Sequence, residues 1–183
     1  MAKIENLFGK LIGLEFNSPA NALHWNAGEK GWTFMGIYEY AHPKWSGWSR
    51  VKEVLEREGK AKGSVTLYYD VVLTKMVEDF YKHEFWDKMR LDEILHQHIA
   101  DEMMVCAVNA GIGTAVKFAQ RLAGVTVDGA IGSKSIAALN VVDPVWFDVE
   151  YDKLEIAHYE MLAANNPNFV KFIKGWRNRA VAV

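Results

Sequence analysis

Apolar positions recur every three or four residues along most of this 183-residue sequence, which is the spacing of one face of an α-helix. An opening helix is predicted over residues 4–15. Its apolar stripe consists of Leu7, Leu11 and Leu14. Further helices are predicted over residues 49–58, 64–82, 92–109, 114–123, 133–140, 148–164 and 167–180. The pattern therefore predicts a mainly α protein.

Residues 16–36 break this pattern and predict a loop region rich in glycine and tryptophan. A short strand is expected around residues 32–38, and a second break follows at residues 41–48. Any β structure should therefore be a small element beside the first helix.

Local signals predict where several later elements begin and end. Gly111 and Gly113 should end the helix that contains Asn109, because glycine favours the left-handed position after a helix. Ser133 is a predicted N-cap. The dipeptide at residues 128–129, Asp-Gly, predicts a turn.

Composition places the chain among ordinary globular proteins of one domain, with at most a small appended lobe. Half of the residues are hydrophobic, 24% are charged, and the net charge is −2. Without a basic block the chain lacks the clustered Lys and Arg that bind a phosphate backbone, so nucleic acid is not an expected partner. Cys106 is the only cysteine, which excludes an intramolecular disulfide and favours a buried thiol.

Membrane and export signals are not apparent in the sequence. No apolar stretch approaches the roughly 18 residues that would span a bilayer, so no membrane association is expected. The N-terminus has one lysine and then an amphipathic segment interrupted by Glu5, unlike the continuous apolar core of a signal peptide. We therefore expect synthesis in the cytoplasm. Any action outside would need a separate export route.

Glu15 is the first candidate for chemistry. It directly follows the apolar stripe of the opening helix, and a polar loop comes after it. A carboxylic acid in such a place can donate a proton to a leaving group. Together with the Thr-x-x-Gly-Ile sequence at residues 33–37, it has the layout of a lysozyme-like active site. The alternative is an exposed glutamate at the end of a surface helix.

Three motifs follow in the C-terminal half. They are Ala-Val-Asn-x-Gly at residues 107–111, Asp-Gly-x-x-Gly-x-x-Ser at residues 128–135, and Gly-Trp-x-x-Arg at residues 175–179. An amphipathic helix, an Asp-Gly turn and a second helix are the layout of small peptidoglycan-binding modules. In this order, and with Glu15 before them, the motifs resemble glycoside hydrolase family 108 over residues 7–179.

The resemblance implies a lysozyme-like helical fold and an N-acetylmuramidase that cuts the β-1,4 bond of peptidoglycan. Such enzymes are often phage or prophage endolysins. It implies a catalytic region over residues 1–110 and a peptidoglycan-binding-like helical region over residues 111–183, packed into the same fold. Glu15 corresponds to the family's catalytic glutamate. Bacterial peptidoglycan is the implied partner, no cofactor is implied, and we expect a monomer that acts on the cell wall after release.

The sequence departs from the family pattern near the expected second carboxylate. The family glutamate is usually followed by two glycines, but here Phe16-Asn17 follows it. The family's Asp-x-Gly-Gly becomes a longer loop that begins at Asn26. Glu29 is the candidate replacement acid, or else a solvated loop residue beside Lys30.

Several other residues are expected around the sugar. Thr33 could hold the attacking water, and Asn26 could orient it. Aromatic side chains suit sugars because they combine apolar area with a polar group. The expected substrate-binding residues are Asn26, Trp25, Trp32, Tyr38, His42 and Asn109. No metal site is predicted, since the sequence contains no His-Glu-x-x-His motif.

Two other functions fit the same sequence. A non-catalytic peptidoglycan-binding protein would keep Glu15 beside a degenerate second position. A helical adaptor would have no affinity for glycan. The sequence also leaves open whether hydrolysis would invert or retain the anomeric configuration.

Overall fold

The computed structural model describes residues 1–16, 18–26 and 28–183. Its internal contacts divide the chain into a larger unit, residues 1–7 and 84–183, and a smaller unit, residues 8–83. Helices make up most of both units, and the only sheet among the described residues is small. The predicted mainly α class is confirmed.

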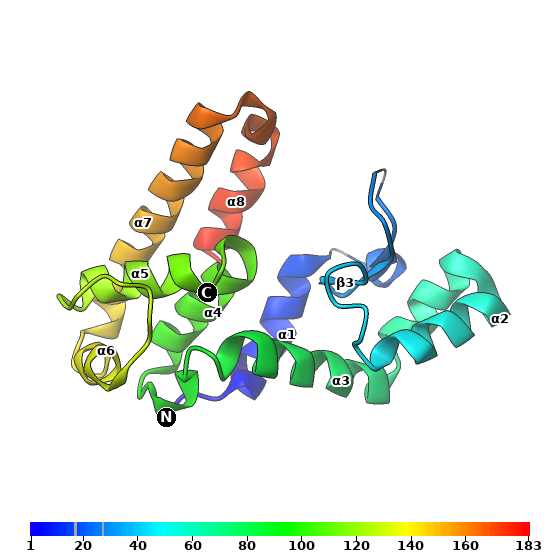
Figure 1. Cartoon of the computed structure of the whole chain (residues 1–183), viewed down its shortest axis with the longest axis horizontal. Coiled ribbons are helices and arrows are strands. Elements are labelled where there is room, and N and C mark those ends of the chain that lie inside the picture. Colours follow the sequence, from blue (N-terminus) through cyan, green and yellow to red (C-terminus); the bar gives the residue numbers. More distant parts are fainter. Residues whose placement is uncertain (17, 27) are drawn as a thin grey trace. The chain divides into compact units, whose positions relative to one another are not determined.

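The smaller unit contains the loop region that sequence patterns singled out. α1 (Ile4–Glu15) begins in the larger unit and ends here. The other elements of this unit are η1 (Pro19–Asn21), β1 (Leu23–His24), β2 (Thr33–Phe34), β3 (Ile37–Tyr38), α2 (Gly47–Tyr68) and α3 (Val71–Tyr81). Figure 1 shows the strands as a narrow hairpin between α1 and α2.

Two chain breaks shape the helices of the smaller unit. α2 bends at Gly59, whose φ of 71° is a left-handed value that glycine adopts without strain. The single helix expected over residues 64–82 is wrong, because α3 starts anew after Asp70. The Asp70 carboxylate accepts a hydrogen bond from the Leu73 N–H at 3.0 Å, which caps α3.

The register of the three-stranded antiparallel sheet separates a core face from an outer face. Leu23 pairs with Phe34, and Phe34 pairs with Ile37; all three side chains are fully buried. Directly paired residues of antiparallel strands have their side chains on the same face. The other face therefore carries His24, Thr33 and Tyr38.

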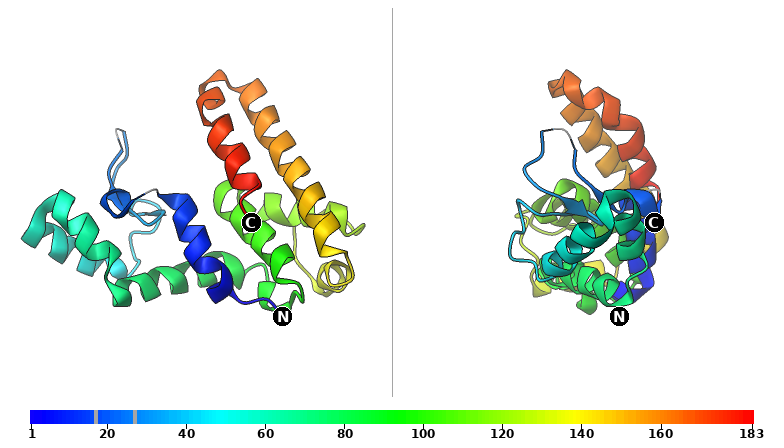
Figure 2. Two further views of the ribbon diagram at one scale, coloured as in Figure 1. Left: turned by 180° about the vertical axis from the view of Figure 1, so that it is seen from behind. Right: turned by 90° about the vertical axis from the view of Figure 1, so that its right-hand side faces the viewer.

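The larger unit is a helical assembly. After η2 (Lys82–Trp86), its elements are η3 (Leu91–Glu93), α4 (Gln97–Ala110), α5 (Ile112–Leu122), α6 (Ser133–Leu139), α7 (Pro144–Asn165), η4 (Pro167–Phe172) and α8 (Ile173–Ala180). α7 and α8 run side by side in every view of Figures 1 and 2. Cys106 of α4 is buried, as predicted.

Several helix boundaries and caps in the larger unit differ from the expected ones; α4, for example, begins at Gln97 and not at residue 92. α6 begins at Ser133 itself, and Gly132 occupies the cap position, so the predicted N-cap is off by one residue. α7 begins four residues earlier than expected. The Asp143 carboxylate accepts a hydrogen bond from the Trp146 N–H at 2.8 Å, and Pro144 fits the first helical position.

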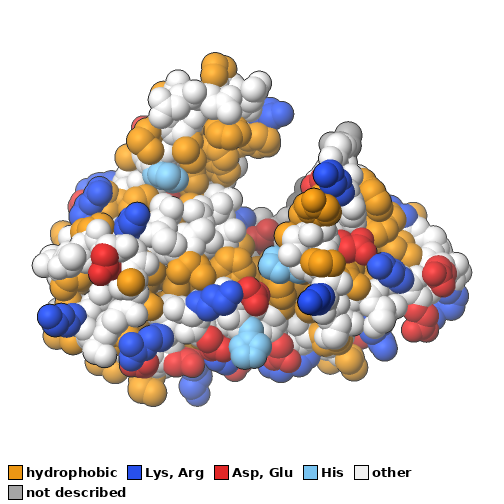
Figure 3. All heavy atoms as spheres, in the orientation of Figure 1, with side chains coloured by type: hydrophobic (Ala, Val, Ile, Leu, Met, Phe, Trp, Pro, Cys, Tyr) orange, Lys and Arg blue, Asp and Glu red, His pale blue; other side chains and the backbone are white. Residues whose placement is uncertain are grey.

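The surface carries charges of both signs. In Figure 3, Lys and Arg side chains lie among Asp and Glu side chains on the face shown, without a broad field of one sign. Within the described ranges, no helix is both long enough and apolar enough to cross a membrane.

Candidate functional site

Glu15, the last residue of α1, lines a hollow of about 500 Å³ in the smaller unit. The other lining residues are Gly13, Leu14, Phe16, Asn21, His24 and Asn26. Among the described residues that line it, Glu15 alone has a carboxyl group. A single acid in a hollow with polar neighbours can protonate a leaving group there.

Gly36 and Tyr81 lie beside the Glu15 carboxylate. A Cβ atom added to Gly36 would lie 3.1 Å from Glu15 Oε2 and 2.2 Å from the Tyr81 hydroxyl oxygen. Gly36 also has a φ of 83°. Tyr81 is buried and donates its hydroxyl hydrogen to the Met35 carbonyl at 2.9 Å. The turn at residues 35–36 is therefore packed closely against the acid and permits no side chain at its glycine.

His24 lies in the same hollow and was not predicted. Its Nδ1 atom is 3.2 Å from the Asn21 carbonyl oxygen. Because a carbonyl oxygen can only accept, this contact requires the hydrogen on Nδ1. In the neutral ring Nε2 then carries the lone pair, so it can accept a proton from water.

Thr33 is directly opposite His24 in the register, and the two side chains share the outer face of the sheet. Thr33 is buried, with 8% of its surface exposed. Its hydroxyl group is thus near His24, although Thr33 is not among the residues that line the hollow.

Glu29 holds the loop that contains Asn26. Its two carboxylate oxygens accept hydrogen bonds from the Asn26 backbone N–H at 3.0 Å and from the Asn26 side-chain amide at 2.8 Å. These bonds, the side-chain one first, lower the pKa of Glu29. Glu29 does not line the hollow of Glu15, whereas Asn26 does.

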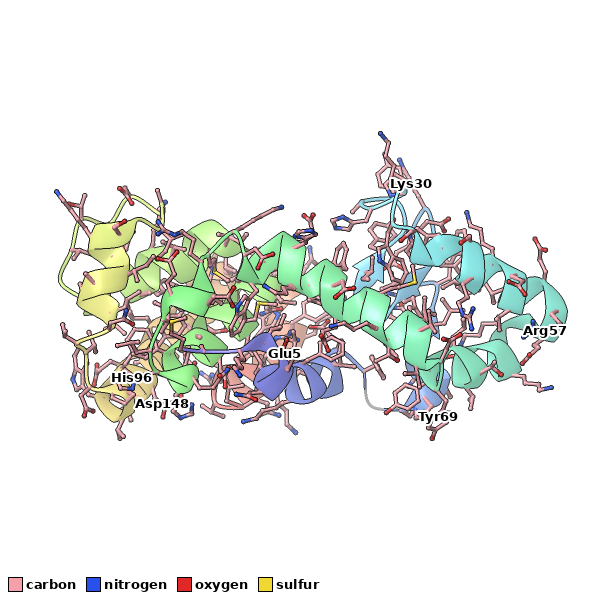
Figure 4. The ribbon with its side chains drawn as sticks, turned by 90° about the horizontal axis from the view of Figure 1, so that it is seen from below. Glu5, Lys30, Arg57, Tyr69, His96 and Asp148 are labelled. Carbon is pink, nitrogen blue, oxygen red and sulfur yellow. The ribbon has the colours of Figure 1, made fainter. Side chains whose placement is uncertain are left out.

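The predicted aromatic residues lie on or near the hairpin. Trp25 is half exposed, packs edge to face on Trp32 with ring centres 5.3 Å apart, and donates its indole hydrogen to the Glu29 carbonyl. The Tyr38 hydroxyl accepts a hydrogen bond from the backbone N–H of Lys30 at 2.8 Å. Lys30 projects from the end of this hairpin in Figure 4.

His42 and Asn109 lie elsewhere. The His42 ring packs edge to face on Phe80, with centres 4.7 Å apart. Asn109, in the larger unit, donates its amide hydrogen to the Tyr159 hydroxyl at 2.6 Å. Both remain predictions as substrate ligands. Asn17 and Ala27, which depart from the family pattern, lie outside the described residues.

A second hollow, of about 590 Å³, lies in the larger unit where α5 meets the loop before α6. The buried side chain of Gln120 forms hydrogen bonds to the loop that lines this hollow. The Gln120 amide nitrogen donates to Asp128 and to the Ala130 carbonyl, and its oxygen accepts from the Gly129 N–H. Asp128 also accepts from the Ala130 N–H, so it forms the turn that the Asp-Gly pair predicted.

His24 and Tyr81 are the residues that the sequence did not reveal. β1 is only two residues long, too short for an alternating pattern that would show which way His24 faces. Tyr81 is at the end of an amphipathic helix and looks like an ordinary core residue. In both cases the residue's role becomes visible only from its contacts in the folded structure.

Comparisons with known proteins agree with this picture. The family model Glycosyl hydrolase 108 matches residues 22–111, and a model described as Predicted Peptidoglycan domain matches residues 114–181. Glu15 lies seven residues before the first match. No curated protein matches the sequence.

A solved structure is similar over almost the whole chain. It is the structure of Brucella abortus SagA, which is 19% identical and has a TM-score of 0.58. The alignment covers 97% of this chain and 93% of that one. At this identity the likeness shows a shared fold.

Proposed function

We propose that the protein is an N-acetylmuramidase that hydrolyses the β-1,4 bond of peptidoglycan, because the glycosyl hydrolase 108 model matches residues 22–111 and a peptidoglycan domain model matches residues 114–181. The observation that carries the proposal is the position of Glu15, at the end of α1 and in a hollow shared with Asn21, His24 and Asn26. The family resemblance also supports a role as a phage or prophage endolysin. The matched peptidoglycan domain supports wall binding.

In the proposed reaction, the Glu15 carboxylic acid gives its proton to the glycosidic oxygen as the bond from that oxygen to C1 breaks. Water attacks C1 from the opposite face and loses a proton. We assign that proton to His24 Nε2, with Thr33 beside it to help hold the water. Glu29 is the alternative acceptor of this proton, although both of its carboxylate oxygens already accept hydrogen bonds from Asn26.

We expect inversion at the anomeric carbon. Retention usually requires a second carboxyl about 5 Å from the first, to act as the nucleophile. Among the described residues, Glu15 has no such neighbour in its hollow. Proton NMR of fresh product should therefore detect the α-anomer first.

Two matched variants test which group receives the proton. His24→Gln keeps a hydrogen-bonding side chain but cannot take up a proton, so turnover should fall about 100-fold. Glu29→Gln should keep most of the activity. Early β-anomer, or a large loss in Glu29→Gln together with an active His24→Gln, would reverse the assignment in favour of Glu29.

A combined binding and lysis experiment separates the proposed enzyme from the two alternatives. Purified sacculi are incubated with the protein, their turbidity is followed, and bound protein is measured after sedimentation. The proposal predicts both sedimentation and clearing. Sedimentation without clearing would indicate a non-catalytic binder, and recovery of all the protein in the supernatant would indicate an adaptor without glycan affinity.

A further inference from the structure

Three carboxyl groups meet between α4 and α7 in the larger unit. Glu102 belongs to α4, and Asp148 and Asp152 lie one turn apart on α7, where i, i+4 spacing places them on the same face. One oxygen from each of the three lies within 4.8 Å of the others. Figure 4 labels Asp148 on its helix.

Glu102 is the most deeply buried member of this cluster. It is only 1% exposed. Both of its carboxylate oxygens, and Oδ1 of Asp152, are buried and have no hydrogen-bond partner of ordinary geometry within the described part of the chain. A buried carboxyl without a partner is costly, so such groups are normally paired or coordinate a metal ion.

The surroundings add negative charge. Glu155, one turn beyond Tyr151, is also 1% exposed and accepts a hydrogen bond from the Tyr159 hydroxyl. Burial, and then the charge of Asp152, raise the pKa of Glu102 to about 10. Burial, and then Asp148, raise the pKa of Asp152 to about 6.

The positive groups that face the cluster are few. His98 Nε2 lies 3.9 Å from Asp148 Oδ1, at the more exposed side of the cluster. Burial raises the pKa of Glu155, and the positive charge of Arg179, in α8, opposes that rise. Cys106, Tyr151 and Tyr159 complete the titratable neighbours, and none of them carries a positive charge. Four carboxyl groups therefore face only one arginine and one histidine among these neighbours.

We propose that Glu102, Asp148 and Asp152 bind a divalent cation that joins α4 to α7. Three carboxylate oxygens are hard ligands, which suit Ca²⁺, Mn²⁺ and Mg²⁺. Three oxygens that are all 4.8 Å apart lie about 2.8 Å from their common centre, so a small inward shift brings them to the roughly 2.3–2.6 Å that is typical of Ca²⁺. Mg²⁺ needs a tighter octahedron near 2.1 Å, so Ca²⁺ and Mn²⁺ should bind better.

The site is open enough for a hydrated ion. Asp148 and Asp152 are partly exposed, whereas Glu102 closes the buried side. Water can therefore supply the remaining ligands from the solvent side. The role of the ion would be structural, within the unit that contains the matched peptidoglycan domain, and it does not depend on the proposed hydrolysis.

The test uses the full-length protein, first treated with EDTA and then dialysed. Calorimetric titration with CaCl₂, MnCl₂ and MgCl₂ should show saturable binding of one ion, with Mg²⁺ the weakest. At a hundredfold excess over Kd, the Tm should rise by about 5–10 °C. Failure of all three ions to bind at millimolar concentration would overturn the proposal.

Neutral variants of the same shape locate the ion. Asp148→Asn and Asp152→Asn lie on the solvent side, and each should weaken binding at least tenfold; Glu102→Gln should do the same. The control is Glu150→Gln on the same helix, whose carboxylate pairs with Lys153 instead. It should bind as the wild type does. Equal binding by the control and by the double variant Asp148→Asn/Asp152→Asn would mean that the ion binds elsewhere.

Discussion

Glu15→Gln should lower the rate of sacculus clearing by about two to four orders of magnitude, because an amide cannot donate the proton that the leaving oxygen needs. The shape of the side chain and its capacity for hydrogen bonding are kept. The Tm should therefore change little, and the variant should still sediment with sacculi. Turbidity, thermal unfolding and sedimentation together measure these three expectations.

Glu5→Gln is the matched control for this variant. It makes the same chemical change on the same helix, at an exposed residue outside the hollow. It should clear sacculi at the wild-type rate. If Glu15→Gln does so as well, Glu15 is not the general acid and the site is assigned wrongly.

Gly36→Ala should have the second large effect, on both activity and stability. The added Cβ would lie 2.2 Å from the Tyr81 hydroxyl oxygen and 3.1 Å from Glu15 Oε2, so the turn, the tyrosine or the acid must move. Small displacements of a catalytic group cost large factors in rate, and we expect a loss of about 100-fold. Clearing rate and Tm are the measurements.

Gly28→Ala separates the steric effect from backbone strain. Gly28 has a φ of 89°, close to that of Gly36, but an added Cβ would meet nothing within 4 Å. The free energy of unfolding of each variant should fall by about 1–2 kcal/mol, because alanine is strained at a left-handed φ. Only Gly36→Ala should also lose most of its activity. Equal activity in the two variants would contradict the close packing of this turn against Glu15.

Helical periodicity predicted most of the fold because the helices are amphipathic and their ends carry local signals. The bend of α2 at Gly59 agrees with a predicted helix that stops at residue 58. The break at Asp70 was missed, because apolar spacing continues across it and the cap forms only when the chain turns. The start of α7 is predicted too late by apolar spacing alone, although Asp143-Pro144 is a local helix-start signal.

The candidate site was predictable only in part. Glu15 was found because it ends an apolar stripe and precedes a polar loop, and Gly36 is part of the Thr-x-x-Gly-Ile motif. His24 was not found, since its place beside Glu15 follows from a two-residue strand and the sheet register. The cluster of Glu102, Asp148 and Asp152 joins residues almost fifty positions apart, and no local pattern reveals such a pairing.

The proposed activity is tested most directly by the chemical identity of the ends released from purified sacculi. Wild type and Glu15→Gln are incubated with the same sacculi, the products are reduced with borohydride, and the fragments are identified by mass spectrometry. A muramidase predicts reduced N-acetylmuramic acid ends from the wild type and almost none from the variant. Anhydro-muramic ends, reduced N-acetylglucosamine ends or free peptides from the wild type would contradict it.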